Sequence, residues 1–419
     1  MTTTPVRAGR REWLGLAVLA LPALLASMDL SVLSMAAPWL SADLEPSGSQ
    51  LLWIMDVYGF LMAGLLITMG SLGDRIGRRR LLLAGAVAFG AASVLAAYAT
   101  TPELLIAARA LLVVGPVLLP ESRGDGGPVD WWSAVLSLGA VLPVIYGVKE
   151  IATHGSVSAS AVLAVAAGLV VGVLFGRRQL RLADPMIDVR LFRRPDFAAA
   201  IGSNAVLTFA TGGMGALAVQ YVQGVLGLRP FAAALWMLPT VAGTILGIAV
   251  ANVLVRRVPA GVVVGAGMGV AALGFALVAQ TVTPSSPVGV VIAAYTVLVL
   301  GVGMAISLLI DLVVGSAPPS RAGSVSAMSE TAGEFGAALG IAVLGSIATA
   351  VYASELRSIG GVPESATGSL GAALAAGESV AAARAAFTHG FTVTATAGAG
   401  LLAAVAVVAG VILTRRRLR

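Results

Sequence analysis

Five charged side chains lie in apolar segments of this sequence away from the segment ends, and they are the residues whose types and spacing could do chemistry. They are Asp29, Asp56, Arg109, Glu330 and Glu334. An ionisable group inside a membrane is costly, so each is a candidate for holding a proton or binding a charged substrate. The alternative for each is a structural role. The aspartates could form hydrogen bonds to neighbouring helices, Arg109 could belong to a buried ion pair, and the glutamates could be stabilised by a helix N-terminus.

The two aspartates are expected at similar depth on neighbouring helices. Asp29 follows Trp13 by sixteen residues, or ~24 Å along a helix, which places it in the outer half of a first span. Asp56 lies about one and a half turns into the second span, also from the outer face. A carboxyl group in such a place can hold a proton near neutral pH, and its ionised form attracts a lipophilic cation.

The other three candidates lie further along the chain. Arg109 falls about two turns into a fourth span, where Asp29 or Asp56 could be its partner. Glu330 and Glu334 are four residues apart, which on a helix puts two like charges one turn apart on the same face. Their position near the inner end of a span suits proton release.

The composition excludes most other classes of protein. A chain of 419 residues that is 58% hydrophobic and 11% charged, with mean hydropathy +0.96, is not a soluble globular protein. It has no cysteine, and its two histidines, His154 and His389, fall in predicted loops, so we expect no metal site and no cofactor. The net charge of +6 comes from arginines between apolar segments, which indicates membrane topology and not nucleic-acid binding.

We expect an all-α, polytopic membrane protein with about twelve transmembrane helices. The predicted spans are 13–36, 51–70, 81–99, 103–119, 131–149, 157–175, 197–220, 231–252, 262–281, 287–311, 326–352 and 390–413.

The distribution of basic residues predicts the orientation. With both termini in the cytoplasm, the cytoplasmic segments hold all but five of the 26 Lys and Arg residues; the five are Lys149, Arg229, Arg357, Arg384 and the intramembrane Arg109. The opposite orientation would violate the positive-inside rule at almost every loop. We therefore predict a multi-pass protein of the plasma membrane with cytoplasmic N- and C-termini.

Three parts of the chain are predicted. Residues 1–119 form a shortened N-terminal helix bundle, and 120–196 contribute two connecting helices and a basic cytoplasmic loop. Residues 197–419 form a C-terminal six-helix bundle with an outer loop at 353–389, which could carry a surface helix. Two bundles with a site between them are the layout of many secondary transporters.

The densest run of charge in the first half lies between the second and third spans. It reads Gly70-Ser71-Leu72-Gly73-Asp74-Arg75-Ile76-Gly77-Arg78-Arg79-Arg80. This stretch resembles the signature loop of the major facilitator superfamily. The resemblance implies a cytoplasmic gating loop, formed by Gly70, Gly73, Asp74, Arg75, Gly77, Arg78 and Arg79.

Three further stretches resemble the fourteen-span drug:proton antiporter branch of that family, namely 28–38, 53–58 and 317–336. Arg109 resembles the fourth-helix arginine implicated there in proton coupling. The resemblance implies a proton-coupled exporter of amphipathic, cationic drugs that works by alternating access as a monomer in the lipid bilayer, without enzymatic activity. A proton-coupled metabolite transporter and a truncated, non-transporting membrane protein are the alternatives.

The resemblance breaks after Leu112. The sequence passes from the start of a fourth helix directly to 113–123, which resembles the end of the sixth helix and the loop after it. This pattern indicates an internal deletion of about two net spans. Either the helices at 131–149 and 157–175 replace the missing ones, or the first bundle is incomplete.

Overall fold

The computed structural model describes residues 78–112, 130–154, 158–182, 188–316, 322–359, 369–377 and 379–414, with Pro185 and scattered positions between 40 and 61. Every regular element in these residues is a helix. The chain forms two compact units, Met1–Val129 and Asp130–Arg419.

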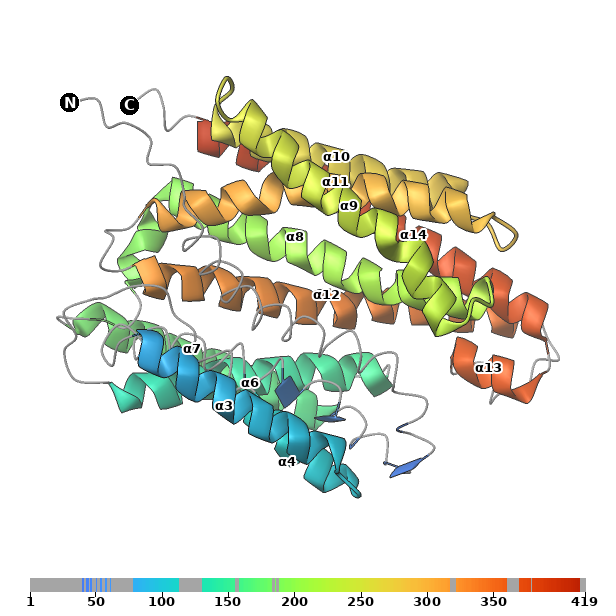
Figure 1. The fold of residues 1–419 in the computed structure, drawn as a ribbon, viewed down its shortest axis with the longest axis horizontal. Coiled ribbons are helices and arrows are strands. Elements are labelled where there is room, and N and C mark those ends of the chain that lie inside the picture. The colour runs from blue at the N-terminus through green and yellow to red at the C-terminus, as the bar shows by residue number, and fades with distance from the viewer. Residues whose placement is uncertain are drawn as a thin grey trace. The chain divides into compact units, whose positions relative to one another are not determined.

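In the first unit, two helices form a hairpin. These are α3 (Arg78–Ala97) and α4 (Pro102–Leu112), drawn in blue in Figure 1. The side chain of Thr101 accepts a hydrogen bond from the backbone N–H of Leu104 (3.2 Å) and so caps the start of α4, where Pro102 fits the first helical position. The hairpin therefore turns at a position set by local sequence.

The second unit contains eight long helices and three short ones in its described part. The long helices are α6 (Trp131–His154), α7 (Ala159–Arg181), α8 (Pro195–Gln220), α9 (Pro230–Leu254), α10 (Ala260–Thr281), α11 (Val288–Val314), α12 (Ala322–Ile359) and α14 (Val380–Thr414). The short ones are the 3₁₀-helix η1 (Val189–Arg193), the π-turn η2 (Tyr221–Val225) and α13 (Leu370–Ala376).

Helices distant in sequence pack side by side in this unit. α8 packs along α12, α11 packs on α9 and α10, and α14 packs on α10 and α12. α7 packs on α6, which in turn packs on α12 (Figure 1). The helices predicted at 131–149 and 157–175 thus belong to the same compact unit as the six C-terminal helices.

Small residues permit these close crossings. A Cβ atom at Gly301 of α11 would lie 2.5 Å from the backbone oxygen of Gly267 on α10, and one at Gly303 would overlap the backbone of Thr244 on α9. These two glycines therefore allow the helix backbones to approach closely. Pro143 lies inside α6, and Pro239 lies inside α9.

The predicted class, an all-helical polytopic membrane protein, is confirmed. Among the described residues, seven helices are long and apolar enough to cross a membrane, and α3 and α6 carry shorter apolar stretches, Gly85–Ala97 and Val135–Gly147. Several helices extend beyond the predicted spans. α12 continues to Ile359 and α14 begins at Val380, so less of the outer segment is loop than expected, and α13 lies within it.

The prediction that both histidines lie in loops was wrong. His154 ends α6, and His389 lies within α14. For α14 the reason is an alanine-rich first stretch of high helix propensity, which starts the helix before its most apolar part. The His389 ring nitrogen Nδ1 contacts Glu355 Oε1 at 2.5 Å and links α14 to α12.

Contacts between helix termini show which ends of α8 and α11 lie together in the second unit. At one end, the Arg194 guanidinium, before α8, donates to the backbone oxygen of Ser316, after α11 (3.0 Å). At the other end, the hydroxyl of Tyr221, after α8, donates to the backbone oxygen of Thr283, before α11 (2.6 Å). α8 and α11 therefore run in opposite directions.

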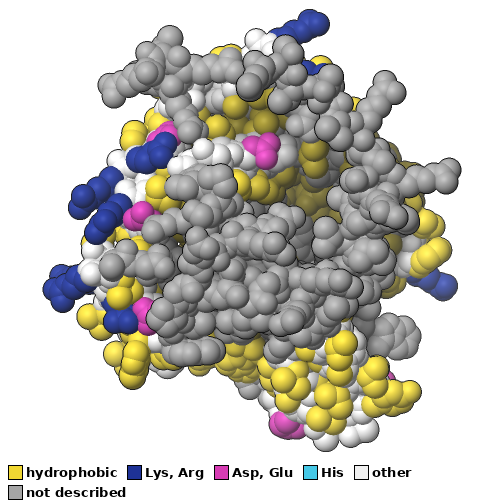
Figure 2. All heavy atoms as spheres, turned by 60° about the vertical axis from the view of Figure 1, so that its left-hand side comes forward, with side chains coloured by type: hydrophobic (Ala, Val, Ile, Leu, Met, Phe, Trp, Pro, Cys, Tyr) yellow, Lys and Arg dark blue, Asp and Glu magenta, His cyan; other side chains and the backbone are white. Residues whose placement is uncertain are grey.

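Basic side chains are concentrated at the end marked by Arg194. Figure 2, in which the left-hand side of Figure 1 comes forward, shows Lys and Arg side chains gathered along one edge. The exposed arginines in the segments that join helices at this end are Arg190, Arg193, Arg194, Arg256 and Arg257.

Candidate functional site

The described part of the predicted site lies on two helices, α4 in the first unit and α12 in the second. Arg109 is on the buried face of α4 with Leu105, Ala108 and Leu112, and only 2% of it is exposed. This spacing of three and four residues forms one stripe along the helix. Arg109 therefore lies on the same face of α4 as three buried apolar residues.

Two described residues that flank Asp56 in the sequence lie against the same helix. Ile54 is fully buried and packs with Leu105, whereas Tyr58 is 3% exposed and packs with Leu112. Asp56 itself lies outside the described residues. Ile54 and Tyr58, which the sequence analysis assigned to the second span, thus lie beside α4.

Glu330 and Glu334 lie on α12, about 12 and 18 Å from its start, given a rise of 1.5 Å per residue. The helix is continuous through both positions, so the two carboxyl groups are one turn apart, as predicted. Glu330 is exposed and Glu334 is half-buried. In the described part of the chain neither glutamate forms an ion pair, so no cation there neutralises them.

A hydrogen bond fixes α12 to α8 beside the glutamates. The side-chain amide of Asn204 donates to the backbone oxygen of Ser329 (2.9 Å) and approaches its hydroxyl (3.4 Å). Asn204 is 5% exposed and Ser329 3% exposed, so both groups are buried. The sequence analysis did not predict a role for Asn204, because it considered only ionisable residues within the spans. A polar amide inside an apolar span could have indicated this residue.

Glycines allow a close approach along the rest of the contact between α8 and α12. A Cβ atom at Gly336 would lie 2.5 Å from the hydroxyl oxygen of Thr208, and one at Gly340 would overlap the backbone oxygen of Phe209. Gly212 and Gly213 on α8 face Ala337 and Gly340 in the same way. This glycine seam and the Asn204 hydrogen bond hold α12, and hence its carboxyl pair, in one position along α8.

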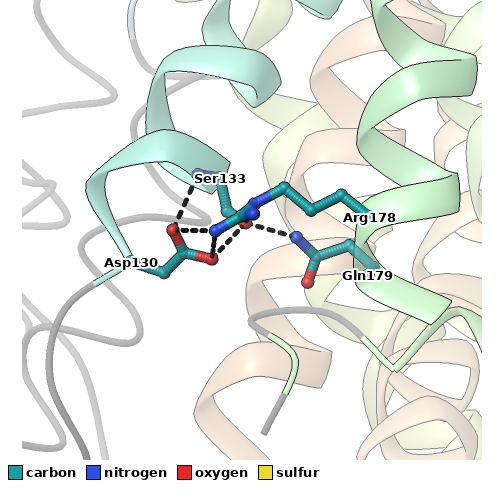
Figure 3. Close-up of polar contacts among 4 residues, drawn as sticks. All are labelled: Asp130, Ser133, Arg178 and Gln179. Carbon is teal, nitrogen blue, oxygen red and sulfur yellow. Dashed lines mark hydrogen bonds and ion pairs between the residues drawn. The ribbon is translucent and has the colours of Figure 1, made fainter. Parts of the chain in front are cut away.

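A second polar cluster, which the sequence did not reveal, joins α6 to α7 (Figure 3). Asp130 accepts two hydrogen bonds from the Arg178 guanidinium (2.8 and 2.9 Å) and one from the Ser133 hydroxyl (2.6 Å). The amide of Gln179, 2% exposed, donates to the same hydroxyl (2.6 Å). We call these four residues the hairpin clamp, after the packed pair of helices α6 and α7 that they join. Its groups satisfy one another, which indicates a structural role.

Electrostatics support that assignment for Asp130. Desolvation by burial raises its pKa, but hydrogen bonds from Ser133 and Arg178, together with the positive charge of Arg178, outweigh the desolvation. The net result is a pKa below the ordinary value of 3.8. Asp130 is therefore ionised at neutral pH and acts as a fixed anion, not as a proton carrier.

The remaining predicted residues lie outside what the structure describes. They are Asp29, Asp56, Gly70, Gly73, Asp74, Arg75 and Gly77. Arg78 and Arg79 begin α3, but their side chains are not described. Among the described residues, no group of three or more His, Asp or Glu side chains could hold a metal ion.

Comparison with known proteins identifies the family. Residues 19–121 match the family model described as Major Facilitator Superfamily. The multidrug efflux pump LfrA of Mycolicibacterium smegmatis is 37% identical, with 99% of each chain covered. The methyl viologen resistance protein SmvA of Salmonella typhimurium is 29% identical, with 83% of this chain and 84% of that protein covered.

A solved structure shares the fold. It is a bacterial homologue of the human lysosomal transporter Spinster, in an inward-facing and unoccupied conformation, with a TM-score of 0.60 at 17% identity. The similarity covers 97% of this chain and 98% of that one.

The comparison with LfrA also bears on chain length. Its alignment runs over 500 positions, whereas this chain has 419 residues, so roughly 80 positions have no counterpart here. The family-model match ends at residue 121, near the break expected after Leu112. Since LfrA is 37% identical over nearly the whole of both chains, this chain belongs to the Major Facilitator Superfamily, a family of membrane transporters and not of enzymes.

Proposed function

We propose that this protein exports amphipathic, cationic drugs across the plasma membrane in exchange for protons. The observation that carries the proposal is the pair of carboxyl groups on α12, Glu330 and Glu334, without an ion-pair partner in the described part of the chain. Unneutralised carboxyl groups on a membrane helix are suited to take up protons or to bind a cation.

The relatives support drugs as the substrate class. LfrA is named a multidrug efflux pump, and SmvA a methyl viologen resistance protein. Methyl viologen is an organic dication, so one relative is linked to a substrate of the charge that buried carboxylates attract. A proton crossing 100 mV releases ~2.3 kcal/mol, enough for about 50-fold accumulation of one substrate molecule.

In this proposal the residues have distinct roles. Asp29 and Asp56 bind a proton or the cation alternately, and Arg109, buried in the same unit, favours release by its positive charge. Glu330 and Glu334 assist from the second unit and release protons. Conformational change then exposes the site to either side, with Gly70, Gly73, Asp74, Arg75, Gly77, Arg78 and Arg79 forming the cytoplasmic gate.

The orientation is part of the proposal. The end of the second unit at which Arg190, Arg193, Arg194, Arg256 and Arg257 gather faces the cytoplasm, following the positive-inside rule. Both termini then lie in the cytoplasm, and the protein works as a monomer.

The test is dye export driven by a pH gradient in proteoliposomes that contain the full-length protein. We expect Glu334→Gln to reduce export of a quaternary-ammonium dye by at least about tenfold, because a group that transfers a proton is lost. Glu355→Gln on the same helix is the matched control and should leave export unchanged, since Glu355 lies at the far end of α12 beside His389. Unchanged export by Glu334→Gln would exclude the proposed role.

A second candidate is a membrane protein without transport activity. The roughly 80 positions of LfrA that have no counterpart here favour it, because the first bundle then lacks spans. The same proteoliposomes distinguish the two: absence of any pH-gradient-driven flux in wild-type protein supports the non-transporting form.

A further inference from the structure

One face of α7 is exposed and changes from apolar to basic along its length. The residues buried on α7 are Ala161, Gly168 and Gln179, which share the face toward α6. The opposite face exposes Val170 (60%) and Leu174 (50%). Seven residues after each of these, at the end of the helix, come the exposed Arg177 and Arg181.

This spacing places the arginines directly above the apolar side chains. Residues at intervals of three and four lie on one stripe of a helix, so 170, 174, 177 and 181 form a single line. The apolar part of such a stripe faces acyl chains, and arginines at its end lie at the depth of the headgroups. The exposed Leu180 lies to one side of this line and extends the apolar surface.

The 3₁₀-helix η1 brings a third arginine to this place. Arg190 donates from its guanidinium to the backbone oxygen of Leu180 (3.2 Å), which holds the side chain against the last turn of α7. Phe192 of η1 is 44% exposed and packs edge-on against Phe197 of α8 (5.3 Å between ring centroids). The exposed ring of Phe192 thus adds apolar surface beside Arg190.

The three arginines lack acidic partners, unlike their neighbours. Within the described residues, Arg178 pairs with Asp130 and Arg194 with Asp196, whereas Arg177, Arg181 and Arg190 form no ion pair. Arg178 therefore serves the hairpin clamp, and the adjacent Arg177 is available to an external anion. Guanidinium groups bind phosphate oxygens through paired, charge-assisted hydrogen bonds.

We propose that Arg177, Arg181 and Arg190 form a binding site for an anionic phospholipid, with its phosphate on the three guanidinium groups and an acyl chain along Val170 and Leu174. We call it the α7 lipid site. A lipid held there joins the end of α7 to η1, which leads into α8. It thereby stabilises the connection between the α6–α7 pair and the C-terminal helices. This proposal is independent of the transported substrate.

The experiment titrates dioleoyl phosphatidylglycerol into the purified full-length protein in detergent and follows thermal unfolding. Dioleoyl phosphatidylcholine provides the uncharged comparison. We expect phosphatidylglycerol to stabilise the wild type preferentially. In the double variant Arg177→Gln/Arg181→Gln the apparent lipid affinity should fall about 30-fold, about fivefold for each arginine lost.

The matched control is Arg256→Gln/Arg257→Gln, which removes the same charge from exposed residues at the same end of the unit. It should retain the wild-type lipid affinity. Equal loss in both double variants would overturn the proposal, because a diffuse basic surface would then explain binding. Stabilisation by glycerol 3-phosphate as strong as by the lipid would overturn the acyl-chain contact. Native mass spectrometry of retained lipid provides a second readout for any variant that unfolds early.

Discussion

At the scale of single residues, the acidic side chains of this protein lie in two kinds of environment. Asp130 is surrounded by donors from Ser133 and Arg178. Glu330 and Glu334 lie on a membrane helix with no ion-pair partner in the described part of the chain. A carboxyl group with fixed donors stays ionised and holds structure together, whereas one without them can change its protonation state.

This contrast gives a pH-dependent prediction for Asp130→Asn. The substitution should cost roughly 1 kcal/mol at neutral pH, a modest value because the Asp130–Arg178 pair is partly exposed to solvent. The pKa of Asp130 is lowered in the folded protein, so its stabilisation is complete above the unfolded value of 3.8 and is lost as pH falls through the lower folded pKa. The difference in melting temperature from wild type should be constant between pH 5 and 7 and shrink below about pH 4.

Thermal unfolding in detergent from pH 7 to pH 3 measures this difference. Asp311→Asn is the control, because Asp311 is exposed and forms no ion pair among the described residues. A deficit for Asp130→Asn that grows with acidification would contradict the prediction.

At the scale of helices, the glycine seam between α8 and α12 determines where the glutamates of α12 lie. Backbone atoms of the two helices approach each other at Gly336 and Gly340, and Asn204 adds a hydrogen bond at Ser329. Backbone atoms cannot move aside as a flexible side chain can. The two helices are therefore expected to move as one body during any change of conformation.

Alanine at Gly340 should destabilise the protein by about 1–3 kcal/mol, because its Cβ would overlap the backbone of Phe209. Gly345, on the same helix, has no atom within 4 Å of a new Cβ. Gly345→Ala should be neutral or stabilising by up to about 1 kcal/mol, since alanine favours helix. Melting temperatures of the two variants test this, and similar values would show that the seam does not hold the helices.

At the scale of the whole molecule, the orientation in the membrane stays a prediction, and the second unit provides one structural fact for it, the opposite directions of α8 and α11. In the second unit, the contact between Arg194 and Ser316 and the contact between Tyr221 and Thr283 lie at opposite ends. In the proposed orientation, the end with the exposed arginines faces the cytoplasm, following the positive-inside rule.

The natural absence of cysteine allows a direct test of this orientation. In intact cells, a membrane-impermeant maleimide should label Ser285→Cys, in the exposed turn between α10 and α11, but not Arg257→Cys, between α9 and α10. Arg257→Cys should react only after the cells are permeabilised. The reverse pattern would invert the topology.

The sequence by itself determined the all-helical membrane class, the family and the approximate positions of the helices. These follow from local properties, namely apolar length, the placement of arginines and short motifs such as Gly70 to Arg80. The single-turn spacing of Glu330 and Glu334 and the burial of Arg109 could also be predicted, because both depend only on the periodicity of one helix.

Only the tertiary structure decided which helices are neighbours. The sequence could not choose whether the helices at 131–149 and 157–175 complete the first bundle, and the structure places them in one unit with the C-terminal helices, with α6 on α12. Asn204 and the hairpin clamp were likewise invisible in the sequence, since Asn204 and Ser329 are 125 residues apart and Asp130 and Arg178 are 48 apart. The physical reason is that partners distant in the chain are selected by packing and hydrogen bonding between helices, which no local pattern encodes.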